Sequence, residues 1–191
     1  MLAPYLENNQ VKLTLLDLSN YQYLIDIAKE KDLVYYSPSQ IASPEELKKY
    51  VQEAVNEYYN GTAIPFIIYD KLKKAYAGST RFANIDLYNK KLEIGWTWIG
   101  KNFQGTGINL HIKYLMLKYV FETLQFDKVQ FRVDERNTRS RKAIEKIGGT
   151  LEGILKKDML MPDGFKRNTC CYAILKEDWN EIKNTVFETL Q

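Results

Sequence analysis

Two glycines stand in a short segment, Gln104-Gly105-Thr106-Gly107-Ile108-Asn109, between a strand-like run and a long apolar helix. Glycines at such a junction leave backbone N–H groups free to face a bound group, and the positive end of the helix dipole points at the same place. The segment therefore predicts a site for a phosphate-bearing ligand. It is not a P-loop, because Ile108 and Asn109 follow the last glycine in place of Lys-Ser/Thr. It is not a dinucleotide fingerprint, because Leu110 stands where a third glycine is needed.

A carboxylate in the preceding strand is the candidate general base. Glu93 belongs to Leu92-Glu93-Ile94-Gly95-Trp96, and the glycine two residues after it leaves room for a ligand on the same face. Strict alternation places Gly95, Thr97 and Ile99 on the face of Glu93, and Leu92, Ile94, Trp96 and Trp98 on the other. An ion pair with Arg81 on the preceding strand is the competing interpretation. Glu152 and Asp158 are weaker candidates for the base.

The elements that position these residues are expected to form one α/β (α+β) domain over residues 1–191. Periodicity and turn residues predict strands at residues 11–16, 64–69, 75–83, 92–99, 128–133, 150–161 and 168–175. Helices are predicted at residues 19–29, 43–58, 108–124 and 137–147, followed by a C-terminal helix with Trp179, Ile182, Val186 and Leu190 on one stripe. The strongest helix start is Ser43-Pro44-Glu45-Glu46, which combines an N-cap serine, a proline at the first helical position and a capping-box glutamate.

The composition is that of an ordinary globular protein, with 191 residues, 45% hydrophobic and 27% charged. No apolar run approaches the roughly 20 residues needed to span a bilayer, and residues 1–7 lack the features of a signal peptide, so a cytoplasmic location is expected. Cys170 and Cys171 are neighbours in a predicted strand and would point to opposite faces, which disfavours a disulfide between them. One histidine and two adjacent cysteines do not supply a zinc ligand set, so no metal is expected.

The charge is uneven, although the net charge is only +3. One segment concentrates six cations, namely Arg132, Arg136, Arg139, Arg141, Lys142 and Lys146. A local anion site explains this clustering better than a basic surface for nucleic acid does, and an RNA or ribosome contact stays open as a minor alternative.

Four motifs resemble those of the GNAT N-acetyltransferases. Gln104 and Gly107 stand at defining positions of the family's acyl-CoA signature, Gln/Arg-x-x-Gly-x-Gly/Ala, whereas Asn109 replaces the final glycine or alanine, a departure shared by part of the RimJ/RimL-like branch. Asn137-Thr138-Arg139-Ser140, with residues 143–149, is similar to the family's Asn-x-x-Ser helix start. Leu151-Glu152-Gly153 and residues 92–96 resemble two further family segments. Because spacing and order also agree, the resemblance covers essentially the whole chain.

The resemblance implies a GNAT-like acyl-CoA N-acyltransferase fold, in which helices flank a mixed seven-stranded sheet and an additional C-terminal helix follows. It implies acetyl-CoA as co-substrate. Its pyrophosphate would lie over the backbone of Gln104, Gly105, Thr106, Gly107, Ile108 and Asn109. Asn137 would bond the pantetheine arm or the backbone of the splayed strands, or act as a helix N-cap. Arg139, Arg141 and Lys142 are the candidates to reach the 3′-phosphate.

Acetyl transfer from a thioester to an amine needs a neutral amine, a donor to the oxyanion and a donor to the departing sulfur. The resemblance implies that a backbone N–H near Trp98 and Ile99 serves the oxyanion. Ser140 is the best-placed donor to the sulfur, and its hydroxyl could equally be a second helix cap. At pH 7 an α-amine is neutral in roughly one molecule in ten, and a lysine amine in roughly one in a few thousand. An α-amine therefore needs only modest help from a base, and the resemblance implies a protein N-terminal α-amine or a small amine as the acceptor.

Two loops are expected to wall the acceptor site, one at Tyr35-Tyr36-Ser37-Pro38 and one near Pro162. A CoA-binding protein without turnover is the principal alternative to an enzyme. The sequence leaves a homodimer open, because the C-terminal helix would pack either on its own sheet or on a neighbouring copy.

Overall fold

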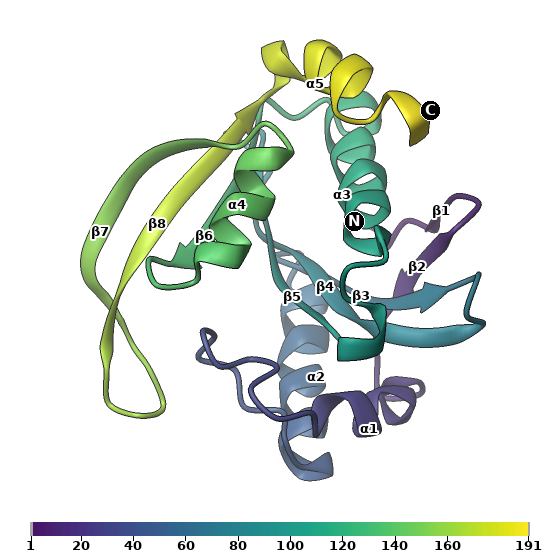
Figure 1. Cartoon of the computed structure of the whole chain (residues 1–191), viewed down its shortest axis with the longest axis vertical. Helices are drawn as coiled ribbons and strands as arrows, with labels where there is room; N and C mark the ends of the chain where they lie inside the picture. The colour runs from purple at the N-terminus through teal and green to yellow at the C-terminus, as the bar shows by residue number, and fades with distance from the viewer. Residues whose placement is uncertain (1, 191) are drawn as a thin grey trace.

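The structure, a computed structural model, describes residues 2–190. It centres on an eight-stranded mixed sheet in the order β1-β2-β3-β4-β5-β6-β8-β7 (Figure 1). The strands are β1 (Leu6–Glu7), β2 (Val11–Leu15), β3 (Ile64–Asp70), β4 (Ala75–Asp86), β5 (Lys91–Ile99), β6 (Lys128–Asp134), β7 (Thr150–Leu160) and β8 (Lys166–Leu175). The predicted fold class is confirmed. The predicted count of seven strands is one short, because β1 has only two residues and carries no alternation pattern.

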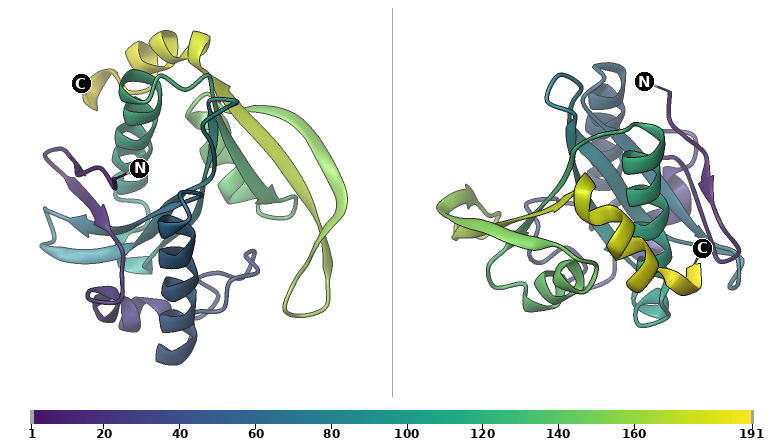
Figure 2. Two further views of the ribbon diagram at one scale, coloured as in Figure 1. Left: turned by 180° about the vertical axis from the view of Figure 1, so that it is seen from behind. Right: turned by 90° about the horizontal axis from the view of Figure 1, so that it is seen from above.

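Helices cover both faces of this sheet (Figures 1 and 2). The α-helices are α1 (Ile25–Ala28), α2 (Pro44–Tyr59), α3 (Ile108–Lys118), α4 (Thr138–Lys146) and α5 (Trp179–Thr185). One hydrophobic cluster joins α1 and α2 to one face, and a larger cluster joins α3, α4 and α5 to the other. None of the helices in residues 2–190 is long and apolar enough to cross a membrane.

The start of α2 follows from local sequence. The Ser43 hydroxyl accepts from the Glu46 backbone N–H at 3.1 Å, and the Glu46 carboxylate accepts from the Ser43 N–H at 3.0 Å, so the predicted capping box is confirmed. The predicted helix at residues 19–29 is shorter and begins as a 3₁₀ turn (Tyr21–Leu24). Its N-cap residue, Asn20, makes no side-chain cap, because its amide bonds the backbone of Leu15 and Asp17. The long helix predicted at residues 108–124 ends as a π turn (Tyr119–Thr123).

The sheet divides between β5 and β6, the one parallel pair among the strands of residues 2–190. Pairing is confined to Lys91–Lys128, Leu92–Val129 and Glu93–Gln130, and beyond these residues the two strands separate. We call this separation the fork; it lies between residues 94–99 of β5 and residues 131–134 of β6. The helix α3 starts just after β5, and α4 starts just after β6, so both helix N-termini lie near the open end of the fork (Figure 1).

A β-bulge lies in β5 beside the fork. Trp96 has φ of +48°, in the left-handed region, and the β4–β5 register shifts between the pairs Arg81–Gly95 and Ser79–Trp98. The predicted strict alternation of β5 is therefore wrong after Gly95. Leu92 and Ile94 pack in the α3-side cluster, whereas Trp96 and Trp98 pack in the α2-side cluster. Thr97, which contacts α3, does not share the face of Glu93.

Candidate functional site

The glycine turn adopts the conformation that a backbone anion site requires. Gly105 and Gly107 have φ of +75° and +85°, and no atom lies within 4 Å of the position a Cβ would take at either residue. Gly107 is the N-cap of α3 and provides no capping side chain. The first-turn N–H groups at Ile108 and Asn109 are consequently left for water or a ligand. The Thr106 hydroxyl is used locally, since it donates to the Phe103 carbonyl at 2.7 Å.

Asn109 carries an unusual polar atom. Its Oδ1 is buried and has no hydrogen-bond partner among the described residues. A buried acceptor without a partner is uncommon in folded proteins, and a ligand donor is one way to satisfy it. The turn and Asn109 together therefore fit the phosphate and amide groups of a CoA molecule.

Gln104 connects the two sides of the fork. Its Nε2 donates to the Ile99 carbonyl at the end of β5 at 2.7 Å, and its Oε1 accepts from Arg139 of α4 at 2.8 Å. The glutamine of the motif thus fixes the turn to β5 and directs a guanidinium of α4 toward the turn. Trp98, the other predicted residue of this strand, is buried and its indole donates to the Tyr50 hydroxyl at 3.4 Å.

The start of α4 contains Asn137 and Ser140. Asn137 is the N-cap residue, and its Oδ1 accepts from the Ser140 backbone N–H at 3.0 Å, so its predicted capping role is confirmed. The half-buried Ser140 hydroxyl makes no hydrogen bond with any described residue, and it does not act as a second cap. That hydroxyl is free to donate to a ligand, while bonding of Asn137 to pantetheine stays a prediction.

Two of the six cations of the basic segment form ion pairs within the molecule, and a third bonds uncharged acceptors. Arg132 pairs with Asp158 at 2.9 Å and Arg136 pairs with Asp134 at 2.7 Å. Arg141 donates to the Tyr172 hydroxyl at 3.0 Å and to the Glu135 carbonyl at 3.3 Å, so its guanidinium is directed into the contact between α4 and β8. Exposed charge in this segment is left at Arg139, Lys142 and Lys146.

Glu93 lies at the closed end of the fork, at the last paired position of β5. It is 5% exposed, and its Oε2 accepts from the Asn84 amide at 2.8 Å. Burial raises the pKa of Glu93, although the Asn84 bond and the charges of Arg132 and Arg167 oppose the change. A Cβ added at Gly95 would lie 3.1 Å from the Glu93 Oε1, so the space left by this glycine holds the carboxylate of Glu93 itself.

The predicted ion pair between Glu93 and Arg81 is absent. Arg81 donates instead to Glu57 of α2 at 2.8 Å, and its guanidinium lies 5.1 Å from the ring centres of both Tyr50 and Trp96. The bulge at Trp96 creates this arrangement by turning the indole to the α2 side. The weaker base candidates are also paired, Glu152 with Lys128 and Asp158 with Arg132.

A cavity of about 270 Å³ lies beside Arg81 and Trp96 on the α2 side of the sheet. Its lining residues are Pro38, Ser39, Gln40, Glu46, Lys49, Tyr50, Glu53, Glu57, Arg81 and Trp96. Three of these are glutamates of α2, against two cations. The lining therefore has a negative excess, and part of it comes from the loop predicted to wall the acceptor site.

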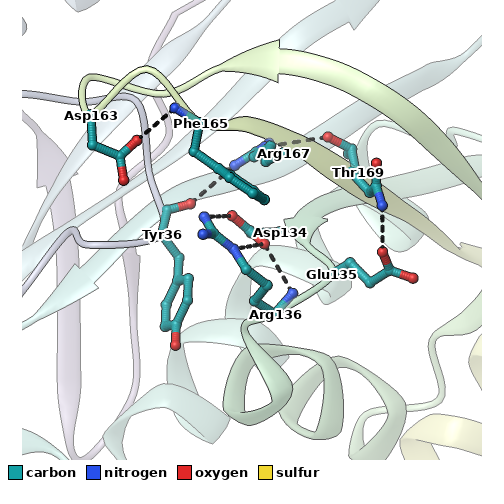
Figure 3. Close-up of polar contacts among 9 residues, drawn as sticks. Tyr36, Asp134, Glu135, Arg136, Asp163, Phe165, Arg167 and Thr169 are labelled. Carbon is teal, nitrogen blue, oxygen red and sulfur yellow. Dashed lines mark hydrogen bonds and ion pairs between the residues drawn. The ribbon is translucent and has the colours of Figure 1, made fainter.

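The two predicted acceptor loops contact each other, although they are about 130 residues apart in sequence. Arg167 of β8 donates to the Tyr36 carbonyl at 3.0 Å (Figure 3). Arg136, held by Asp134, lies with its guanidinium 3.8 Å from the Phe165 ring centre and 5.8 Å from that of Tyr36 (Figure 3). The β7–β8 loop and the loop before α2 thus form one wall near the C-terminal end of β6.

Lys113 is a buried cation that the sequence interpretation passed over. It lies on α3, is 7% exposed, and its Nζ donates to the Thr97 hydroxyl of β5 at 3.1 Å. Burial lowers the pKa of Lys113 to about 7. A signal was available, because Lys113 precedes Val120 by seven residues and therefore lies on the apolar side of the helix.

Metal-ligating side chains are not grouped in the described part of the chain. Residues 2–190 contain no cluster of three or more His, Cys, Asp and Glu side chains that could hold a metal ion. The lone His111 bonds Asn8 through its Nδ1 at 2.9 Å. Cys170 and Cys171 are free thiols, the first buried and the second half-buried, as alternation predicted.

Comparison with known proteins agrees with this geometry. The family model for the acetyltransferase (GNAT) domain matches residues 11–150. The curated protein "Putative ribosomal N-acetyltransferase YdaF" from Bacillus subtilis (strain 168) is 34% identical over 106 residues, which are 56% of this chain and 57% of that protein. The matched region thus spans less than two thirds of that relative.

Solved structures match over nearly the whole chain. A "putative acetyltransferase" from T. thermophilus has a TM-score of 0.89 and 28% identity, and the match covers 100% of this chain and 99% of that one. The spermidine N-acetyltransferase from Vibrio cholerae, solved with CoA and spermine, has a TM-score of 0.75 and 17% identity over 91% of this chain and 99% of that one. At that identity the second likeness is one of fold alone.

Proposed function

Because the chain belongs to the GNAT acetyltransferase family, we propose that it transfers the acetyl group of acetyl-CoA directly to a primary amine. The observation that carries this proposal is the fork between β5 and β6, with the uncapped start of α3 at its open end. The pyrophosphate lies over residues 104–109, and the pantetheine arm follows the unpaired edge of β5 toward Glu93. Arg139 adds a positive charge near the phosphates, whereas Arg141 holds α4 against Tyr172.

The transfer then uses groups at both ends of the fork. The neutral amine attacks the thioester carbonyl carbon, a C–N bond forms, and negative charge moves to the carbonyl oxygen, which a backbone N–H near Trp98 and Ile99 stabilises. The C–S bond then breaks and the sulfur leaves with the electron pair. The free hydroxyl of Ser140 donates a hydrogen bond to that sulfur, and the thiolate takes its proton from solvent to end as the CoA thiol. The extra proton of the amine passes to Glu93, directly or through a water.

The surroundings of Glu93 suit this role. A base works best when its pKa lies near the working pH, and burial moves the pKa of Glu93 upward from its ordinary value. A carboxylate is too weak a base to deprotonate a lysine ammonium readily. An acceptor whose amine is less basic therefore fits better. The negative excess of the cavity beside Trp96 favours a cationic acceptor over an anionic one.

The acceptor class we propose is a protein N-terminal α-amine. We also propose that this enzyme acts in the cytoplasm. The curated relative at 34% identity carries the name of a ribosomal N-acetyltransferase, which supports this class. The spermidine acetyltransferase shares the fold, and a small polyamine is therefore the competing acceptor to test.

A thiol-release assay with acetyl-CoA tests the proposal. The panel contains peptides with free N-termini, the same peptides with blocked N-termini and one internal lysine, and linear polyamines. We expect release of CoA thiol with the free α-amines and little with the blocked peptides. Tight binding of CoA with no thiol release from any amine would refute the enzymatic function, and turnover confined to polyamines would refute the acceptor class.

The Glu93→Gln variant tests the base, with Glu188→Gln, an exposed carboxylate near the C-terminus, as the matched control. We expect kcat to fall by about 10²-fold or more in Glu93→Gln. The acid limb of the pH–rate profile should also vanish, because the wild-type rate rises as Glu93 loses its proton. An unchanged kcat at every pH would exclude Glu93 from the mechanism.

A further inference from the structure

Lys113 is placed beneath the fork by contacts on both of its sides. Its Nζ lies 3.1 Å from the Thr97 hydroxyl of β5 and 5.9 Å from the ring centre of Phe131 on β6. Phe131 is the residue just after the last β5–β6 pair, so the ammonium lies where the two strands begin to separate. Lys113 is thus a buried charge close to the path proposed for the acyl group.

Thr97 connects this charge to the fork. Its side chain is exposed, whereas the other hydroxyl that it contacts, that of Thr80 at 2.8 Å, is fully buried. The Thr80 hydroxyl donates in turn to the Met116 sulfur at 3.7 Å. The Thr97 hydroxyl therefore accepts from Lys113, and its own proton lies near two acceptors, the Thr80 hydroxyl and the Gly95 carbonyl at 3.3 Å. To donate to a ligand, Thr97 turns this proton away from them, while Thr80 can donate to Thr97.

The Lys113 ammonium has no countercharge. No carboxylate of the described residues lies within ion-pair distance of its Nζ. The groups that contact it from β5 and β6 are Thr97 and Phe131, and Thr80 of β4 contacts Thr97. The charged residues nearest to Thr80 on β4 and to Thr97 on β5 are Arg81 and Glu93. Both project from the opposite face of the sheet. Arg141 and Glu145 of α4 are both bonded to Tyr172.

A buried cation with no anion beside it is costly unless something else compensates for it. Negative charge that develops nearby during a reaction would be strongly stabilised by such a cation, because the low-dielectric surroundings leave it poorly screened. The proposed acetyl transfer creates such charge twice, first on the carbonyl oxygen and then on the sulfur.

We propose that Lys113 is a positioning residue for acyl transfer, whose ammonium polarises the Thr97 hydroxyl so that this hydroxyl donates to the charge formed on the thioester. This inference rests on the proposed function. When the amine attacks the carbonyl carbon, Thr97 supplements the backbone donors to the oxygen. When the C–S bond breaks and the sulfur takes the electron pair, the Lys113 charge stabilises the thiolate until its proton arrives.

Substitutions at Thr97 give the first test. Thr97→Val keeps the shape and removes the hydroxyl, and we expect kcat to fall by about 10–100-fold, less than the 10²–10³ typical of a sole oxyanion donor. Thr97→Ser should restore most of the rate. The matched control is Thr80→Val, which removes the buried hydroxyl of the same chain and should change kcat by about twofold at most. Equal losses in Thr97→Val and Thr80→Val would indicate a packing role and overturn the proposal.

The pH profile of Lys113→Arg gives the second test. The acceptor and Glu93 titrate alike in both enzymes, so the ratio of wild-type to Lys113→Arg kcat/KM for acetyl-CoA isolates the group at position 113. Because the charged form is the active one and burial lowers the pKa of Lys113 to about 7, this ratio should be constant below pH 7 and fall above it. A ratio independent of pH from 6 to about 9 would overturn the proposal.

A third measurement needs no turnover and so separates this inference from the proposed function. The Lys113 resonance in protein labelled at lysine carbons is assigned by its loss in Lys113→Arg and followed against pH with CoA and with desulfo-CoA. We expect CoA to raise the midpoint of the Lys113 titration above that seen with desulfo-CoA. An equal midpoint with the two ligands would overturn the placement of Lys113 near the sulfur, even in an active enzyme.

Discussion

The stability of a Lys113→Met variant should reveal the energetic penalty of a buried ammonium. Lys113 is 7% exposed and has no carboxylate partner, and its pKa falls from the ordinary 10.5 to about 7 because of burial. At about 1.4 kcal/mol for each pH unit, that lowering corresponds to about 5 kcal/mol against the folded state. Local relaxation and water entry reduce this figure, so we expect Lys113→Met to stabilise the protein by about 2–5 kcal/mol at pH 6.

The sign of the pH dependence follows from proton binding. Between pH 7 and 10.5 the unfolded chain holds the Lys113 proton and the folded chain does not, so wild-type stability rises with pH across this window relative to the variant. The advantage of Lys113→Met should therefore be full below pH 7 and shrink toward zero near pH 10.5.

Urea unfolding of both proteins at a series of pH values measures this difference. Lys48→Met, which removes an exposed lysine of α2, is the control and should show no comparable trend. A stability difference that stays constant from pH 7 to 10, or a Lys113→Met protein that is less stable than wild type at pH 6, would refute the assignment of Lys113 as a penalised buried cation.

Three further outcomes follow from contacts at the site. In Gly95→Ala the new Cβ would lie 3.1 Å from the Glu93 carboxylate, so kcat should fall about 3–10-fold with little loss of stability; an unchanged kcat would separate Glu93 from the rate-limiting step. Gln104→Ala removes the link from Ile99 to Arg139 and should raise the Kd for CoA about tenfold by calorimetry, whereas the exposed Gln52→Ala should not. Ser43→Ala removes the α2 cap and should lower the free energy of unfolding by about 1 kcal/mol at constant kcat; a loss of CoA binding would contradict a purely local role.

Local sequence signals predicted those parts of the protein in which a residue's partners lie within a few positions along the chain. The Ser43–Glu46 capping box, the Asn137 cap of α4 and the glycine turn at residues 105–107 all have this character. The α/β fold class also followed, because the apolar periods of the strands and of α3 are properties of the sequence itself. The same periodicity predicted that the phosphate turn lies between β5 and α3.

Other features depended on register and on contacts between distant elements. The bulge at Trp96 moves the tryptophans to the α2 side, because one inserted residue reverses the alternation that follows it. Arg81 then pairs with Glu57 of α2, and Glu93 with Asn84, which periodicity along β5 does not specify.

The glycine turn and the caps that begin α2 and α4 follow from local sequence, because the interactions responsible act over one helical turn or less, and the fold class follows from the apolar periodicity. The separation of β5 and β6 after Glu93, and the position of Lys113 beneath it in contact with Thr97, arise only when distant elements pack together. Burial and the loss of a countercharge arise when α3 packs across two strands, and no residue in the helix carries that information alone.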